Sequence, residues 1–321
     1  MRNASSRWAA LFVASLASTL GCAGEQSSSS DAQGSELIRG EPVATGDLRS
    51  VVELGNRETS FCTAAKVGPR HILTAAHCVL AAPDDRATDC APQPATDPDD
   101  DTPTPCEHGE QWKGPLRLRV RSATRDRWVP IKVAKISVPR FVIDACRTSQ
   151  CFWDLPGHRR VPDIAILETE DDIPDATAAP VDVTRITAGT DILTLGYGCT
   201  RSGPRWIGDD ELRSHPGAVV SLRSIETDEV ADFEDAFRPG LEASYFFSPG
   251  SSLRQAALCP GDSGGPLLRP TGEVIGVNAY YLNASRGSTM RANMFTRLDE
   301  GAAGKVTDWL RRRLPTAAFR E

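Results

Sequence analysis

Three short motifs contain residue types that many enzymes use in catalysis. In residues 73–78, His77 is followed directly by a cysteine, a combination that can also bind a metal, although no zinc spacing such as His-Glu-x-x-His is present. Asp163 opens an apolar run that is typical of a β-strand. In residues 259–266, Ser263 has glycines on both sides, which permit a tight turn and let backbone N–H groups approach a reacting atom. This third motif is the most specific of the three.

In the order His77, Asp163, Ser263, the motifs resemble those of the chymotrypsin/trypsin family of serine proteases. The resemblance extends over residues 37–314 and includes a terminal helix that contains a tryptophan. It implies an all-β fold of two six-stranded antiparallel barrels, with the site in the cleft between them. Other triad enzymes use other residue orders, so the order itself is a marker of this fold.

The resemblance assigns a role to each residue. Ser263 Oγ would be the nucleophile, and His77 would take its proton and later return it to the leaving amine. Asp163 would be buried, accept the other imidazole N–H and fix the tautomer of the ring. The backbone N–H groups of Gly261 and Ser263 would form the oxyanion hole. The implied activity is that of a serine endopeptidase, which needs no cofactor and no metal ion.

The elements that must position these residues are mostly strands. Residues 48–54, 116–120 and 131–136 alternate, or nearly alternate, apolar and polar side chains, as half-buried strands do. Residues 274–277 are apolar enough for a short buried strand. The pattern indicates one helix, at residues 305–314.

We expect the protease domain to occupy residues 37–321. Its first barrel should cover about 37–172 and its second about 185–302, with a connector between them and the helix at about 303–314. The chain has 321 residues, of which 40% are hydrophobic, and this length can bury a sizeable core.

Charge and hydropathy exclude other classes of protein. The 36 Lys and Arg residues and 43 Asp and Glu residues give a net charge of −7, whereas a nucleic-acid-binding protein needs a basic face. No apolar run reaches the ~18 residues of a spanning helix, which excludes a multi-span membrane protein.

Much of the acidity is local to an insertion at residues 81–110, which contains nine acidic residues, one basic residue and six prolines. Cys90 and Cys106 flank its acidic centre at residues 99–101. A solvated loop closed by a disulfide is one interpretation. A calcium loop is the other, because closely spaced carboxylates suit a hard cation.

The N-terminal residues have the pattern of an export signal. Residues 1–21 contain a positive start and an uncharged, mostly apolar stretch, and residues 18–22 resemble a bacterial lipobox ending at Cys22. A lipidated Cys22 would anchor the protein to a membrane through a flexible tether or propeptide at residues 22–36. The alternative is secretion after cleavage behind Ala23. We therefore expect an exported protein of the cell envelope or outer membrane, or a secreted one.

Residues 37–42 resemble the mature N-terminus of the family. There, the new α-ammonium group pairs with the aspartate before the nucleophile, so Leu37 would pair with Asp262. The cut would follow Glu36, and the activating protease would not be one that cleaves after Arg or Lys. The alternative is a chain that folds in its active form without this cut.

Nine cysteines indicate an oxidising compartment, and lipidation or removal of Cys22 leaves an even number. The resemblance implies a disulfide beside the catalytic histidine. No cysteine follows Cys259 to serve as its usual family partner, and Cys199 lies in the loop that would face the same wall of the cleft. The expected pairs are Cys62–Cys78, Cys199–Cys259, Cys90–Cys106 and Cys146–Cys151.

The resemblance also indicates the specificity pocket. The residue at its base, an aspartate in trypsin-like enzymes, is the uncharged Ala257. Two wall glycines of the family correspond to Tyr281 and Asn293, which fill space. We expect no cleavage after Arg or Lys and a preference for small apolar residues, with a small polar residue as the alternative.

One departure from the family favours a different function. Ala279 stands where the family has a serine that hydrogen-bonds the catalytic aspartate, so the chain could be a catalytically weak or silent surface lipoprotein that acts as a binding module. The presence of His77, Asp163 and Ser263 favours an active, monomeric peptidase that takes protein or peptide substrates.

Overall fold

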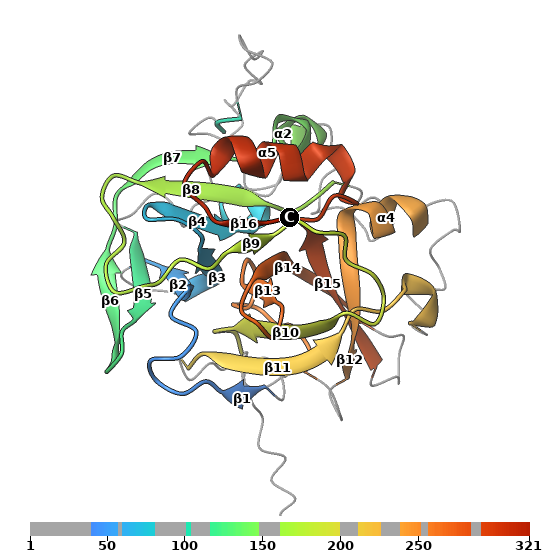
Figure 1. Cartoon of the computed structure of the whole chain (residues 1–321), viewed down its shortest axis with the longest axis horizontal. Helices are drawn as coiled ribbons and strands as arrows, with labels where there is room; N and C mark the ends of the chain where they lie inside the picture. The colour runs from blue at the N-terminus through green and yellow to red at the C-terminus, as the bar shows by residue number, and fades with distance from the viewer. Residues whose placement is uncertain are drawn as a thin grey trace, which may run out of the picture. The chain divides into compact units, whose positions relative to one another are not determined.

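The strands form two β-sheets in the computed structural model of the chain (Figure 1). All the described residues belong to the unit Gly34–Glu321, in which strands far outnumber helices, so the all-β class is confirmed. The structure describes residues 40–56, 60–80, 101–103, 116–147, 161–199, 211–225, 238–251, 256–283 and 290–321.

The first sheet has seven strands in the order β6-β5-β2-β3-β4-β8-β7, and every pair is antiparallel. Strand β2 is buried along its whole length and pairs with β3 on one side and β5 on the other. The strands are β2 (Val51–Gly55), β3 (Ser60–Lys66), β4 (His71–Thr74), β5 (Arg117–Arg121), β6 (Asp126–Pro130), β7 (Val133–Ser137) and β8 (Ala165–Thr169).

The second sheet has nine strands. Seven follow one antiparallel path in the order β1-β11-β10-β13-β14-β15-β12, and β9 joins both β14 and β16 in parallel. The strands are β1 (Glu41–Pro42), β9 (Val181–Asp182), β10 (Asp191–Gly196), β11 (Arg213–Ala218), β12 (Tyr245–Ser251), β13 (Pro266–Leu268), β14 (Val274–Asn283), β15 (Met290–Arg297) and β16 (Phe319–Arg320).

The strand counts of seven and nine differ from the expected six in each barrel. In the second sheet, the two-residue strands β1, β9 and β16 account for the excess. In the first sheet, β3, β4 and β6 were not among the individually predicted strands, and β6 is exposed or half-exposed throughout and lacks the alternation of a half-buried strand.

The largest apolar cluster of the described residues joins the two sheets, and the second sheet also has two smaller clusters of its own. The largest buried cluster contains residues of β2, β3, β4 and β8, together with Leu195 of β10 and Val277 of β14. Thr63 of β3 donates its backbone N–H to the carbonyl of Ser263, beside β13. Residues that come from both sheets can therefore meet at this junction.

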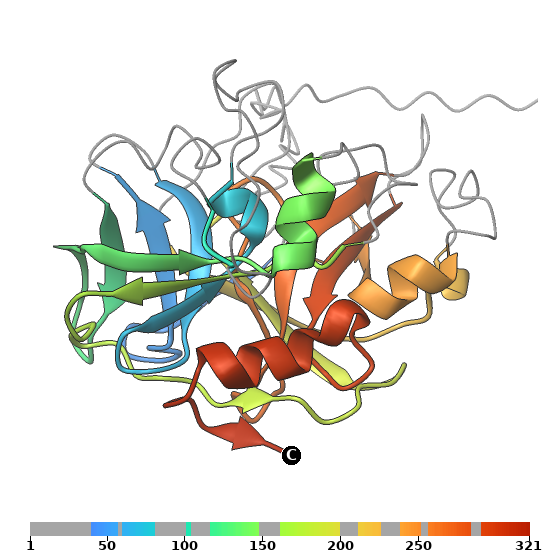
Figure 2. The same ribbon diagram turned by 90° about the horizontal axis from the view of Figure 1, so that it is seen from above.

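Three α-helices of the described chain lie outside the sheets, and none of them is long and apolar enough to cross a bilayer. The predicted C-terminal helix is α5 (Val306–Arg313), which buries Trp309 and Leu310. Helices α2 (Arg140–Arg147) and α4 (Arg238–Ser244) were not predicted. Figure 2 shows α2 and α5 on the same side of the strands.

Asp101 is the only acidic residue of the insertion at 81–110 that the structure describes. Its buried carboxylate accepts a hydrogen bond from Trp309 Nε1 at 2.9 Å and forms ion pairs with Arg313 at 2.6 Å and Lys135 at 3.6 Å. Because two cations already neutralise this carboxylate, Asp101 does not fit the calcium-loop interpretation. Asp99 and Asp100 lie outside the described residues.

Candidate active site

His77 and Asp163 lie at the same end of the first sheet. Strands β4 and β8 are antiparallel neighbours, with Thr74 opposite Ala165. His77 follows this pair in the short 3-10 helix Ala76–Cys78, and Asp163 lies two residues before the start of β8. The register of two strands therefore brings together two side chains that are 86 residues apart in sequence.

The Asp163 carboxylate holds His77 through two contacts. His77 Nδ1 lies 2.5 Å from Asp163 Oδ2, and the backbone N–H of His77 donates to Asp163 Oδ1 at 2.9 Å. A carboxylate oxygen facing Nδ1 favours the tautomer in which Nδ1 carries the proton and Nε2 is the acceptor. Asp163 is only 2% exposed, so this contact is shielded from water.

Ser263 lies on a turn that precedes β13. Gly261 and Gly264 flank it with φ angles of +99° and +79°, a region that favours glycine. A Cβ atom at Gly264 would overlap Thr74 Oγ1 and the carbonyl of Thr63 in the first sheet. The turn therefore needs a glycine here to lie against the neighbouring barrel.

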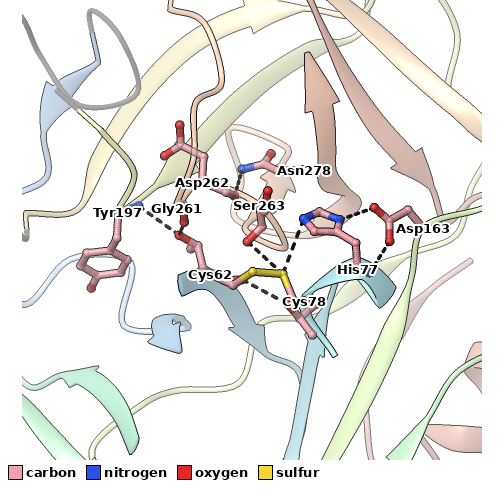
Figure 3. The surroundings of a disulfide bond; sticks show 11 residues. Cys62, His77, Cys78, Asp163, Tyr197, Gly261, Asp262, Ser263 and Asn278 are labelled. Carbon is pink, nitrogen blue, oxygen red and sulfur yellow. Dashed lines mark hydrogen bonds and ion pairs between the residues drawn. A yellow bond between two sulfur atoms is a disulfide. The ribbon is translucent and has the colours of Figure 1, made fainter. Parts of the chain in front are cut away.

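His77, Asp163 and Ser263 line one cavity of about 360 Å³. In Figure 3 the His77 ring lies between Asp163 and Ser263, with the Cys62–Cys78 disulfide beneath them. Among the hydrogen bonds of the described residues, none joins Ser263 Oγ to His77 Nε2. The three predicted residues are thus brought to one cavity, and two of them are in direct contact.

The turn leaves two backbone donors available for a substrate oxygen. The N–H groups of Asp262, Gly264 and Gly265 all donate to carbonyl oxygens within the protein. The N–H groups of Gly261 and Ser263 have no acceptor among the described residues. These are the two donors that were predicted to form the oxyanion hole.

A family model described as a trypsin-like peptidase domain matches residues 59–277, which is more than half of the chain. The chain belongs to this family. No curated protein matches it. The match includes strands of both sheets and all three motifs, and it supports a serine-protease type of function for this member of the trypsin-like peptidase family.

The Asp262 carboxyl group of the peptidase is completely buried behind the turn. Its two oxygens accept the backbone N–H groups of Gly198 and Cys259, each at 2.9 Å. Burial raises the pKa of Asp262 to about 7, although these two hydrogen bonds act to lower it. Its predicted partner, Leu37, lies outside the described residues.

The predicted specificity residues divide into two groups. Tyr281 lines the cavity, whereas Ala257 and Asn293 are buried and are absent from its lining among the described residues. Successive side chains of a strand point to opposite faces, so in β15 Met294 lines the cavity in place of Asn293. Leu258, the residue after Ala257, also lines the cavity. The remaining wall consists mainly of Tyr245, Ala279 and Tyr280.

Asn293 instead supports the cavity wall from behind. Its Oδ1 accepts the N–H of Leu258 at 2.9 Å, and its Nδ2 donates to the carbonyl of Ala256 at 3.0 Å and to Ser248 Oγ at 3.1 Å. An amide with this many protein partners is poorly placed to hydrogen-bond a substrate. The structure therefore corrects the assignment of Asn293 to the pocket surface.

Two predicted disulfides are present, Cys62–Cys78 and Cys199–Cys259. Cys146 is also disulfide-bonded, but its predicted partner Cys151 lies outside the described residues, as do Cys90, Cys106 and Cys22. Cys62, His77 and Cys78 lie close enough together to resemble a metal site. Their sulfur atoms are joined to each other, and a disulfide is not the thiolate ligand that zinc requires.

Asn278 contributes to the site but was not predicted. Its side-chain Nδ2 donates to the carbonyls of Asp262 at 2.9 Å and Leu195 at 2.7 Å, and its backbone bonds Gly264 and Gly265. An amide in the otherwise apolar run 274–279 is the sequence signal that could have identified it, because a buried amide needs partners.

Proposed function

We propose that the chain is a serine endopeptidase that uses Ser263 as nucleophile, His77 as general base and acid, and Asp163 to orient the histidine. The observation that carries this proposal is the His77–Asp163 contact in a cavity that Ser263 also lines. The proposal concerns the residues and the reaction, and it refines the protease function that the family supports.

The reaction would begin with transfer of the Ser263 Oγ proton to His77 Nε2 as the oxygen attacks the substrate carbonyl. Rotation about the Ser263 Cα–Cβ bond moves Oγ between staggered positions, and in many enzymes this hydrogen bond tightens only when substrate is bound. Gly261 and Ser263 would donate to the oxyanion. His77 would then protonate the leaving amine, and water would hydrolyse the acyl-enzyme in the same way.

The cavity favours an apolar residue before the cleaved bond. Its lining includes Leu258, Ala279 and Met294, and its only carboxylate among the described residues is Asp163, which is held by His77. A buried Arg or Lys of the substrate would find no free acidic partner there, which is costly. The ring of Tyr281 narrows the space, so we expect cleavage after small apolar residues such as Ala or Val.

Activation by a new N-terminus at Leu37 is part of the proposal. Pro42 pairs with Arg213, Arg213 pairs with Gly196, and Gly196 lies directly against the Asp262 carboxylate. Two strand spacings of about 4.8 Å separate β1 from β10, and the few residues from Gly40 back to Leu37 can span roughly 10 Å. A chain beginning at Leu37 should be active, and Asp262→Asn should fold but be poorly active.

Export, and a lipid anchor on Cys22, complete the proposal. They explain the oxidised cysteines and give the peptidase access to protein substrates outside the cytoplasm. Replacing Cys22 by Ser should move the protein from the membrane fraction to the soluble fraction, because a diacylated cysteine is a two-chain anchor. Unchanged fractionation would favour simple secretion.

The second candidate is a catalytically weak or silent binding module. Two observations favour it: Ala279 has no hydroxyl, and both hydrogen bonds that the Asp163 carboxylate accepts among the described residues come from His77. Labelling with a fluorophosphonate distinguishes the two functions. An active enzyme should be labelled at Ser263, with no labelling in Ser263→Ala, whereas a silent module should react no faster than that variant.

A further inference from the structure

Thr63 is a completely buried residue of β3, in the first sheet, but its hydrogen bonds reach the turn of the second sheet. Its backbone N–H donates to the carbonyl of Ser263 at 2.8 Å. Its hydroxyl donates to the carbonyl of Gly261 at 2.7 Å. One residue of the first barrel thus holds the backbone on both sides of Asp262.

The Gly261 carbonyl needs such a partner. Gly261 has φ of +99°, and a glycine without a Cβ can rotate its peptide groups more freely than any other residue. A rotated peptide group would direct a carbonyl where an N–H is required. The bond from Thr63 Oγ1 fixes the peptide group between Gly261 and Asp262, which lies between the two peptide groups that carry the N–H groups of Gly261 and Ser263. The bond from Asn278 Nδ2 to the Asp262 carbonyl fixes the peptide group that carries the Ser263 N–H.

The same hydroxyl also connects the turn to a second segment. Thr63 Oγ1 accepts the backbone N–H of Tyr197 at 3.0 Å, and the next residue, Gly198, donates its N–H to the Asp262 carboxylate. The neighbouring backbones of Tyr197 and Gly261 can be followed in Figure 3. The hydroxyl therefore uses its proton and one lone pair to connect the Gly261 carbonyl with the Tyr197 N–H.

We propose that Thr63 is a positioning residue for hydrolysis. Its hydroxyl holds the Gly261 carbonyl and the 196–198 segment so that the N–H groups of Gly261 and Ser263 point at the developing oxyanion. Thr63 does not touch the reacting atoms, and its effect is transmitted through the backbone of the turn. This inference rests on the proposed peptidase function and adds a residue of the first barrel to it.

The test compares Thr63→Val with Thr63→Ser. Valine keeps the size and branching of threonine and removes the hydroxyl, whereas serine keeps the hydroxyl. With a peptide ester substrate, Thr63→Val should lower kcat roughly 10- to 100-fold and change KM less than about twofold, because only transition-state binding is lost. Thr63→Ser should retain most of kcat.

Thr169→Val is the matched control. Thr169 is a buried threonine of β8 in the same sheet, and its hydroxyl donates to the carbonyl of Asp171 at 2.6 Å, away from the turn. This variant should lose thermal stability as Thr63→Val does, but it should keep kcat within about twofold. If Thr63→Val does not fold, Thr63→Ala removes the same hydroxyl without placing a methyl group against two polar atoms, and it carries the same expectation.

A peptide boronic acid gives a second measurement, because its adduct with the serine mimics the tetrahedral oxyanion. Its inhibition constant should rise in Thr63→Val by the same factor by which kcat/KM falls. A wild-type kcat in Thr63→Val, or an equal loss in Thr169→Val, would overturn the inference and leave the proposed function intact. A folded wild-type protein no more active than Ser263→Ala would overturn both.

Discussion

The His77–Asp163 pair and the turn that carries Ser263 are held in place by different kinds of contact. His77 and Asp163 are joined directly and are brought together by the register of β4 and β8 within one sheet. Ser263 lies on a glycine-containing turn held through its backbone by groups from both sheets, with a buried carboxyl group behind it. The pair follows from strand pairing, whereas the turn depends on several tertiary contacts at once.

If the proposed function is right, removing His77, Asp163 or Ser263 should have the largest effect. Ser263→Ala, His77→Ala and Asp163→Asn should each lower kcat/KM by roughly 10⁴-fold or more, because the three act as one unit. Double variants should lose little beyond the worse single variant. Kinetics on proteins with unchanged circular dichroism measure this, and additive losses would show that the two halves of the site act independently.

The carboxyl group behind the turn should make stability depend on pH. The pKa of Asp262 is about 7 in the folded protein and near 3.8 in the unfolded chain, so the folded state retains its proton to higher pH. The free energy of unfolding of the uncut chain should therefore fall by up to about 4 kcal/mol as pH rises from about 4 to about 7.

Urea unfolding at several pH values measures this dependence. Asp262→Asn should abolish the fall in unfolding free energy between about pH 4 and pH 7. Asp182→Asn, which alters a buried carboxylate paired with Arg269, should leave that fall in place. A free Leu37 ammonium should also reduce it by stabilising the ionised carboxylate. The same slope in Asp262→Asn and in the unaltered chain would contradict the assignment.

The two disulfides hold the two halves of the site and should contribute differently to the free energy of unfolding. Cys62–Cys78 closes 16 residues beside His77, and Cys199–Cys259 closes 60 residues around the turn. By chain entropy, replacing each pair by alanine should cost about 3 and about 4 kcal/mol respectively. Calorimetry on the two double variants would test this order, and the reverse order would mean that contacts at His77 outweigh loop length.

The smallest expected effect concerns the cavity wall. Tyr281→Ala should admit larger apolar residues and raise kcat/KM for cleavage after Phe or Leu about tenfold relative to Ala, because one aromatic ring is removed from the lining. Asn293→Ala should instead lower activity on all substrates, because it frees the backbone of Leu258. Profiling with a peptide library decides between these outcomes, and a dominant cleavage after Arg or Lys would contradict the pocket.

Much of this site could be predicted from short-range sequence patterns. The motifs around His77, Asp163 and Ser263 identify residues that share one cavity, and the matched cysteines identify two disulfides. The alternation of apolar residues identified strands but not the helix Arg140–Arg147, whose eight residues are too few for a clear helical period.

The remaining features depend on facts that no local pattern contains. Which of Asn293 and Met294 faces the cavity depends on the side to which a strand turns its side chains, and β14 shifts register between Asn278 and Tyr280 beside them. Thr63 has no catalytic signature of its own. Its role appears only when β3 is placed against the Ser263 turn of the second sheet.

The contacts of Asp101 should make the local unfolding of two segments cooperative. Its carboxylate binds Trp309 and Arg313 of α5, and its carbonyl accepts the N–H of Val138 after β7. Segments that share a buried charge cannot open singly without leaving that charge uncompensated, so the amide protons of α5 and Val138 should exchange with solvent in one cooperative event. Asp101 thereby connects α5 to the segment that follows β7, and the local unfolding of one should accompany the local unfolding of the other.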